Sequence, residues 1–229
     1  MMWFYNESSA RCEKFYTGKK YDKGNNFASK EACNTICRDE HYGDCGGAKN
    51  DSICKDEVEL RFWFDPDNRT CKSYKYGGCD PNSNTFRTKL ECLLECAEFI
   101  ENRCALPIDE GDCMDGSETR FGYNRVFHSC EEFKYTGCGG NRNNFKTAKE
   151  CWTTFANNSR CLKHTQENSG WYRPYTSYYY NVEKNECRKT KTFFRKSAAH
   201  KYNRFLTTQE CERVCKRKHT PRTRSPYDM

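Results

Sequence analysis

Residues 45–96 read CGGAKNDSICKDEVELRFWFDPDNRTCKSYKYGGCDPNSNTFRTKLECLLEC, and their six cysteines are separated by 8, 16, 7, 12 and 3 residues. The first four spacings recur over residues 104–151, and Phe155 then stands in the place of the sixth cysteine. A pattern that recurs at a fixed period, here about 60 residues, is typical of a chain built from structural repeats. The chain is therefore predicted to be a row of small modules.

Two less complete copies of the pattern flank these. The first carries Cys12, Cys33 and Cys37, and the last carries Cys161, Cys187, Cys211 and Cys215. Other residues keep the same register, because a Phe lies six positions and an Asn eight positions before the second-last cysteine position of each copy: Phe27, Phe86, Phe145 and Phe205; Asn25, Asn84, Asn143 and Asn203. This agreement predicts one fold for all four copies.

The composition excludes several classes of protein. The 229 residues include 18 cysteines, 35% are hydrophobic and the mean hydropathy is −1.10, which disfavours one large core and a membrane span. Aromatic residues make up 15%, too many for a disordered chain. So many cysteines favour disulfides in an oxidising, extracellular space. No pattern predicts catalytic residues, a metal site or a cofactor, so we expect a secreted protein that is not an enzyme.

The cysteine spacing, the run Tyr76-Gly77-Gly78-Cys79, and the placement of Asn84 and Phe86 resemble the Kunitz family, the bovine pancreatic trypsin inhibitor type. The resemblance implies a small disulfide-rich α+β fold of tandem modules. Each module would be a twisted β-hairpin followed by a short C-terminal helix, as over residues 88–96. The layout is similar to that of tissue factor pathway inhibitors and of the multi-Kunitz anticoagulants of tick saliva.

The pattern divides the chain into four modules and a tail. We expect a partial module one whose N-terminal half is missing, a complete module two, a module three without its last cysteine, a divergent module four and a basic tail, over residues 1–37, 45–96, 104–155, 161–215 and 216–229. Flexible linkers are expected between the modules, over residues 38–44, 97–103 and 156–160. The first residues do not read as a signal peptide, so we expect the secretion signal upstream of Met1.

The resemblance also implies a disulfide pairing. The expected pairs are Cys12–Cys33, Cys45–Cys96, Cys54–Cys79, Cys71–Cys92, Cys113–Cys138, Cys130–Cys151, Cys161–Cys215 and Cys187–Cys211. Cys37 and Cys104 remain. The partner of Cys37 is expected upstream of Met1, and a Cys37–Cys104 bridge is the alternative. Because module three lacks the bridge between its two ends, we expect it to be less stable than module two.

In the Kunitz family the residue after the second cysteine typically enters the specificity pocket of a serine protease. By this resemblance, Lys55 in module two would suit a trypsin-like protease, and Met114 in module three would suit an apolar pocket. The expected support of the Lys55 loop is Cys54, Asp56, Gly77, Gly78 and Cys79. Three features depart from the family: one extra residue between the second and third cysteines, the two acidic residues after Lys55, and Ser52 where the family usually has Gly. In module three, Thr136 replaces the Gly that usually lets the second loop approach.

The outer modules carry no complete loop of this kind. Gly170 and Arg195 occupy the positions of the second and fourth cysteines in module four, and Lys20 occupies a bridge position in module one. No ordinary protease inhibition is expected from these two modules.

Positive charge gathers at the C-terminal end. Residues 187–229 carry 13 Lys or Arg against three Asp or Glu, about +10, whereas the whole chain is +7. Such a field attracts heparin-like polyanions or anionic surfaces, and the expected ligands are Lys216, Arg217, Lys218, Arg222 and Arg224. The expected partners are thus a trypsin-like serine protease, for example of coagulation, and a polyanion, with no nucleic acid. The competing hypothesis is a Kunitz module that binds a channel, a receptor, a protease exosite or heparin without inhibition.

Overall fold

The structure is a computed structural model. It describes residues 1–17, 24–55, 57–79, 81–114, 116–165, 172–193 and 202–221. The chain divides into two compact units, Met1–Asn102 and Arg103–Met229, and each is described by itself.

An antiparallel β-hairpin forms the centre of each module, as the aromatic runs predict. In the first unit the strands are β1 (Met2–Asn6) with β2 (Arg11–Phe15), and β3 (Glu59–Asp65) with β4 (Thr70–Tyr76). In the second unit they are β5 (Glu118–Asn124) with β6 (Ser129–Tyr135), and β7 (Tyr175–Asn181) with β8 (Glu186–Thr192). The register is constant, because each hairpin sets an aromatic residue opposite the cysteine of its second strand, as Phe64 lies opposite Cys71.

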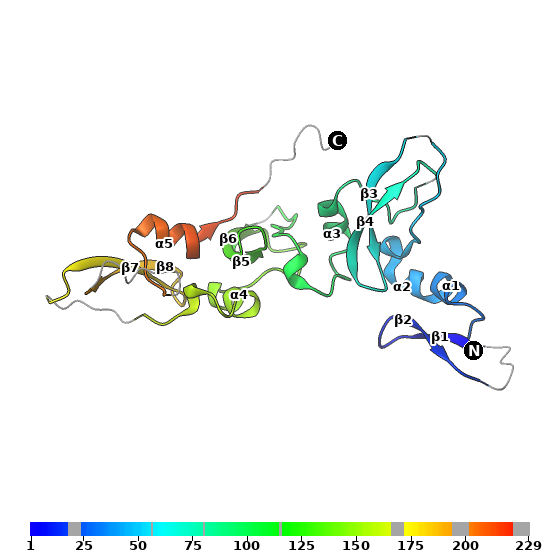
Figure 1. The fold of residues 1–229 in the computed structure, drawn as a ribbon, viewed down its shortest axis with the longest axis horizontal. Helices are drawn as coiled ribbons and strands as arrows, with labels where there is room; N and C mark the ends of the chain where they lie inside the picture. Colours follow the sequence, from blue (N-terminus) through cyan, green and yellow to red (C-terminus); the bar gives the residue numbers. More distant parts are fainter. Residues whose placement is uncertain are drawn as a thin grey trace. The chain divides into compact units, whose positions relative to one another are not determined.

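A short helix follows each hairpin and packs against it (Figure 1). The helices are α1 (Lys30–Cys33), α3 (Lys89–Glu95), α4 (Ala148–Phe155) and α5 (Thr208–Cys215). The hydroxyl of Thr88 accepts a hydrogen bond from the amide of Glu91, and the Glu91 carboxylate accepts one from the amide of Thr88. This pair of hydrogen bonds is a capping box. Thr147 and Glu150 repeat this arrangement in module three.

The repeated Asn and Phe fasten the hairpin in every module. Asn84 is fully buried and accepts the amide of Phe64 at 2.7 Å while donating to the carbonyls of Phe64, Cys45 and Gly47. Phe86 forms a β-bridge with the first strand of its hairpin. The same two contacts recur at Asn25 and Phe27, Asn143 and Phe145, and Asn203 and Phe205.

Disulfides join the helices and chain ends to the hairpins. The eight bridges are Cys12–Cys33, Cys45–Cys96, Cys54–Cys79, Cys71–Cys92, Cys113–Cys138, Cys130–Cys151, Cys161–Cys215 and Cys187–Cys211, the pairs implied by the resemblance. Cys37 and Cys104 lie outside them, so the alternative Cys37–Cys104 bridge is not formed. In module three the Phe155 ring lies 5.3 Å from those of Tyr123 and Phe145, so that aromatic packing occupies the position of the sixth cysteine.

The segment expected to be a flexible linker between modules one and two is folded, which corrects that expectation. Residues 34–46 form η1 (Asn34–Arg38), α2 (Asp39–Tyr42) and η2 (Gly43–Gly46). Tyr42 is 2% exposed, and its ring lies 5.6 Å from that of Phe64 and 4.9 Å from that of Phe99. Turns follow α3 and α4 and lead into η3 (Arg103–Ala105) and η4 (Arg160–Leu162). In the segment between modules one and two, the ring of Tyr42 packs into a core, and the cysteine spacing does not predict this contact.

The beginning of the basic tail is also folded. Strand β9 (Arg217–Lys218) pairs in parallel with β6, opposite Glu131 and Glu132. Residues 217–219 therefore contact module three, while Thr220 and Pro221 are exposed and Arg222 and Arg224 lie outside the described residues.

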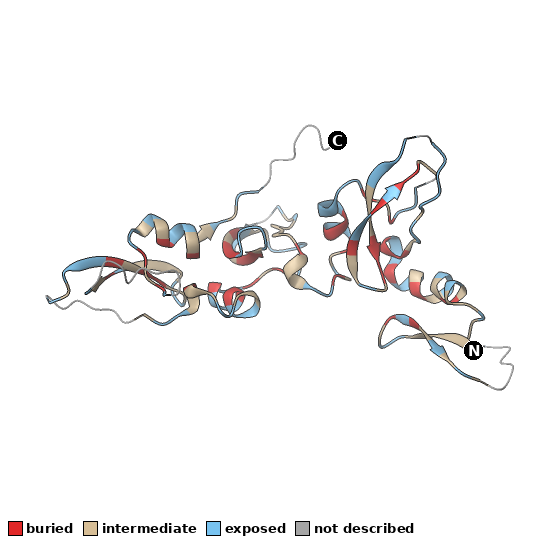
Figure 2. Ribbon diagram, viewed as in Figure 1, coloured by how far each residue is buried: buried red, intermediate tan, exposed pale blue. Residues whose placement is uncertain are grey.

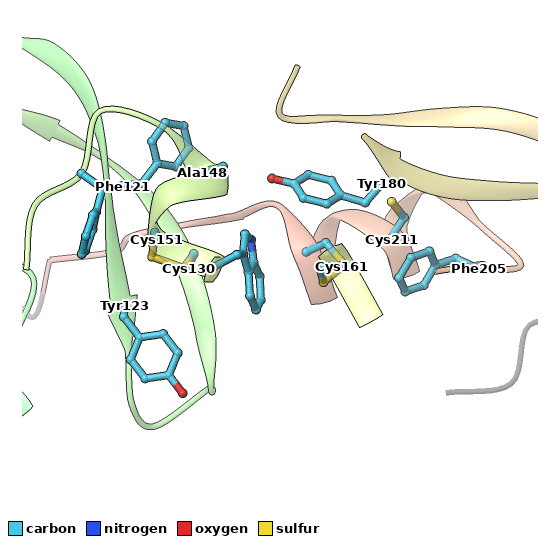
Figure 3. Close-up of a cluster of buried hydrophobic side chains, with 12 residues drawn as sticks. Phe121, Tyr123, Cys130, Ala148, Cys151, Cys161, Tyr180, Phe205 and Cys211 are labelled. Carbon is cyan, nitrogen blue, oxygen red and sulfur yellow. A yellow bond between two sulfur atoms is a disulfide. The ribbon is translucent and has the colours of Figure 1, made fainter. Parts of the chain in front are cut away.

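Burial follows the junction of hairpin and helix. Strand β3 is exposed at Glu59 and Leu60 and buried at Phe64 and Asp65, whereas β4 alternates between buried and exposed residues. Figure 2 marks the buried residues in red. In the second unit one cluster of buried side chains draws on both modules. Figure 3 shows the Tyr180 ring between Ala148 of module three and Cys211 of module four.

Candidate functional site

Two backbone hydrogen bonds hold the loop that follows Cys54. The amides of Cys54 and Lys55 both donate to the carbonyl of Gly77, at 2.8 and 2.9 Å. The disulfide Cys54–Cys79 crosses the same two segments, and Ile53 forms β-bridges with Gly77 and Gly78. The first residues of the loop are thus fixed by a disulfide and by hydrogen bonds.

Gly77 is required for this close approach. A Cβ on Gly77 would lie 2.4 Å from the carbonyl oxygen of Ser52 and 2.5 Å from the Cα of Ile53, both backbone atoms that cannot turn aside. The Tyr76 hydroxyl donates to the Cys79 carbonyl and braces the same turn from its other side.

Lys55 is exposed, and its side chain lies over Gly78. A Cβ on Gly78 would lie 2.5 Å from Cδ and 2.8 Å from Cγ of Lys55. Two apolar residues near it in the sequence are also exposed, Ile53 by 75% and Val58 by 50%. An exposed cation on a braced loop can enter a concave site with an acidic floor. Asp56, expected to support this loop, lies outside the described residues.

Module three holds its loop by a different acceptor. The amide of Cys113 donates to the hydroxyl of Thr136 at 3.2 Å, and the amide of Thr136 donates to the carbonyl of Glu110 at 2.8 Å. Thr136 occupies the position of Gly77, so a side-chain oxygen here replaces a backbone carbonyl. Sequence reasoning treated Thr136 only as an obstacle and missed this role. Met114 is 99% exposed at the tip of the loop.

The outer modules offer no described counterpart. Lys20, Gly170 and Arg195 all lie outside the described residues. The structure therefore brings expected loop residues together in modules two and three, and the geometry at these three positions stays a prediction.

The basic residues after Cys215 divide into two groups. Lys218 is exposed and Lys216 is half-buried. Arg217 instead lies against module three, with its Nε 3.3 Å from the Glu131 carboxylate and its guanidinium carbon 3.9 Å from the centre of the Phe127 ring. The guanidinium of Arg217 thus already has an ion-pair partner and a ring contact, and its role toward a polyanion stays a prediction, as do those of Lys216 and Lys218.

Two further kinds of group could carry chemistry, namely the thiols of Cys37 and Cys104 and side chains that bind metal ions. Burial raises the pKa of the Cys37 and Cys104 thiols, which disfavours the reactive thiolate. In the described part of the chain, no cluster of His, Cys, Asp and Glu is placed to hold a metal ion. None of the helices described here combines the length and the apolar character needed to cross a membrane.

Comparison with known sequences agrees with this geometry. The sequence model of the Kunitz/bovine pancreatic trypsin inhibitor domain matches residues 1–38, 44–97 and 103–154. The chain is 34% identical over 151 residues to the carboxypeptidase inhibitor SmCI of Sabellastarte magnifica, covering 65% of this chain and 86% of that protein. It is 35% identical over 155 residues to tissue factor pathway inhibitor 2 of Bos taurus, covering 66% and 65%. It is 29% identical over 235 residues to papilin of Drosophila melanogaster, covering 93% and 8%. It thus spans less than two thirds of the last two proteins.

Proposed function

Because this chain belongs to the Kunitz/bovine pancreatic trypsin inhibitor domain family, we propose that it is a secreted inhibitor of trypsin-like serine proteases that acts through Lys55 of module two. The family relatives named above include inhibitors of a carboxypeptidase and of the tissue factor pathway. The eight disulfides support the assignment to a secreted protein, since such bridges persist in oxidising compartments.

The observation that carries the proposal is the bracing of the Lys55 amide. Its hydrogen bond to Gly77 and the neighbouring Cys54–Cys79 bridge fix the backbone before any partner arrives. A preorganised loop loses little conformational entropy on binding, so more of the contact energy appears as affinity. Lys55 reaches the acidic floor of a specificity pocket by turning its side chain away from Gly78.

The same bracing favours inhibition over turnover. If the protease attacks the peptide bond after Lys55, the Cys54–Cys79 bridge keeps the acyl side of the cut attached to the module. The amine side remains attached through strand β3, which pairs with β4. Both ends then stay close together, and religation competes with release. The acidic Glu57 beyond the cut narrows the range of targets to proteases that tolerate negative charge there.

The test is a titration of the oxidised full chain against trypsin and chymotrypsin, with Lys55→Ala beside the wild type. We expect tight inhibition of trypsin that Lys55→Ala weakens at least 100-fold. Lys75→Ala removes another exposed lysine on β4 and is the matched control, which should inhibit as the wild type does. Equal inhibition by wild type and Lys55→Ala would show that another module or surface acts on the protease.

The second candidate function is that the chain binds a heparin-like polyanion without inhibiting proteases. The charge of about +10 over residues 187–229 favours this function. Exposed Lys218 belongs to this region. This function predicts retention on immobilised heparin that is lost at high salt, together with no effect on proteases.

A further inference from the structure

An ion pair between the helix of one module and the hairpin turn of the next occurs in both halves of the chain. Lys30 Nζ lies 2.7 Å from Asp67 Oδ2, and Lys149 Nζ lies 2.6 Å from Glu183 Oε1. Each lysine is on the helix of one module, and each acid is in the hairpin turn of the next, four positions before the cysteine of the second strand. In both units, therefore, the helix of one module meets the hairpin turn of the next.

In the first unit the turn of module two lies against module one. Arg38 is 7% exposed, binds Asp39 at 2.6 Å and reaches Asp67 at 3.4 Å. Arg69, in the same turn, donates to the carbonyl of Ser9 at 2.6 Å. These contacts join two hairpin turns and the helical segment between the modules.

In the second unit the modules share buried side chains. Trp152 on α4 and Tyr180 on β7, each 2% exposed, belong to one cluster (Figure 3). The Tyr180 hydroxyl donates to Asn185 at 2.8 Å, and Asn185 in turn donates to Glu132 of module three at 2.7 Å. A hairpin turn again contacts the preceding module.

Strand β9 adds a second connection that the first unit does not share among its described residues. The chain leaves module four at Cys215 and returns to module three, where Arg217 and His219 both lie near Glu131, at 3.3 and 3.2 Å. The amide of His219 donates to the carbonyl of Glu132 at 2.8 Å. Glu131 is 2% exposed, so its carboxylate depends on these partners.

Val126 occupies the position that Asp67 and Glu183 hold in the other turns, and it has no charge to offer. The acid is thus present in every second turn.

We propose that the cooperative unit of this chain is the module pair, one with two and three with four, and that strand β9 holds module four on module three. In this arrangement β9 and the shared cluster supply stability that module three loses because it lacks the disulfide between its ends. A partner that contacts both modules of a pair meets them already oriented, without the entropy cost of aligning independent modules.

Hydrogen exchange on the oxidised full chain tests this coupling. Asn203→Ala removes a buried side chain whose hydrogen bonds, among the described residues, all lie within module four. Coupled modules require that exchange then rises at least fivefold in β6 as well as in β7 and β8, with β3 and β4 unchanged. A rise confined to β7 and β8 would mean that the modules open independently, and would overturn the proposal.

A milder pair of variants tests strand β9 without disturbing a core. Arg217→Ala should raise exchange in β6 at least fivefold, whereas Lys218→Ala, which alters an exposed side chain of the same strand, should leave it within twofold of the wild type. Unchanged exchange in Arg217→Ala would show that β9 does not hold the pair together.

Discussion

The amide of Lys55 donates to the carbonyl of Gly77 at 2.9 Å, and the amide of Cys54 shares the same acceptor. One carbonyl oxygen thus positions the residue proposed to enter the protease and the residue before it. The shape of the loop therefore depends on how closely the Gly77 backbone approaches the segment before Lys55. Glycine permits this approach because it has no Cβ.

Replacing Gly77 by Ala should weaken inhibition of trypsin about tenfold or more. The new methyl group would meet the Ser52 carbonyl at 2.4 Å, and overpacking of this kind costs about 1–3 kcal/mol. The inhibition constant is the measurement. Ser73→Ala, on the exposed face of β4, is the control and should leave the constant unchanged. An unchanged constant for Gly77→Ala would show that the protease does not need the braced loop.

Replacing Thr136 by Val should loosen the loop of module three. The substitution removes the hydroxyl that accepts the Cys113 amide, a contact worth about 1 kcal/mol. Exchange of the Cys113 amide should rise about fivefold, and Thr136→Ser, which keeps the hydroxyl, should restore the slow rate. If Val and Ser behave alike, the hydroxyl does not hold the loop.

The cysteine spacing predicts the contacts within each module. Asn84, Phe86 and their counterparts occupy equivalent positions in the four copies, because each must fasten its own hairpin. The positions of Asp67 and Glu183 also follow the repeat, but the sequence does not say which helix each turn meets. Contacts between modules depend on how two folded surfaces fit.

The same limit applies within the candidate site. The exposure of Lys55 and its place beside Cys54 could be predicted from the repeat. The role of Thr136 could not, since it depends on a hydroxyl replacing a carbonyl across two loops. The docking of Arg217 was also missed, because a run of basic residues reads as a solvated tail. The acidic pair Glu131-Glu132, in a strand whose counterpart in module two reads Lys72-Ser73, was the available signal.

Replacing Asn84 by Ala should destabilise module two more than Asn25→Ala destabilises module one. Asn84 is fully buried, and its loss leaves four backbone groups without their partner, at a cost of about 3 kcal/mol. Asn25 is the matched control, since it is exposed and, among the described residues, its side chain makes two such bonds, both to Tyr5. Thermal unfolding of both variants is the measurement, and equal effects would show that burial does not set the cost.

The docking of strand β9 should weaken in acid. Burial by itself would raise the pKa of Glu131, but hydrogen bonds from His219 and Asn124 and the charges of His219 and Arg217 outweigh it and hold this pKa below its ordinary value of 4.5. A carboxyl group whose pKa is lower in the folded state stabilises that state above the ordinary value, and the stabilisation is lost as the pH falls through the folded pKa.

Thermal midpoints of the wild type and of Glu131→Gln, measured from pH 7 to pH 2, check this. The wild type should be the more stable protein near neutrality, and the difference between the two midpoints should shrink steadily below pH 4.5. Glu212→Gln, an exposed change on α5, should track the wild type at every pH. A difference that is the same at pH 7 and pH 2 would mean that Glu131 acts through its shape alone, and that the charges of Arg217 and His219 contribute nothing to holding the strand.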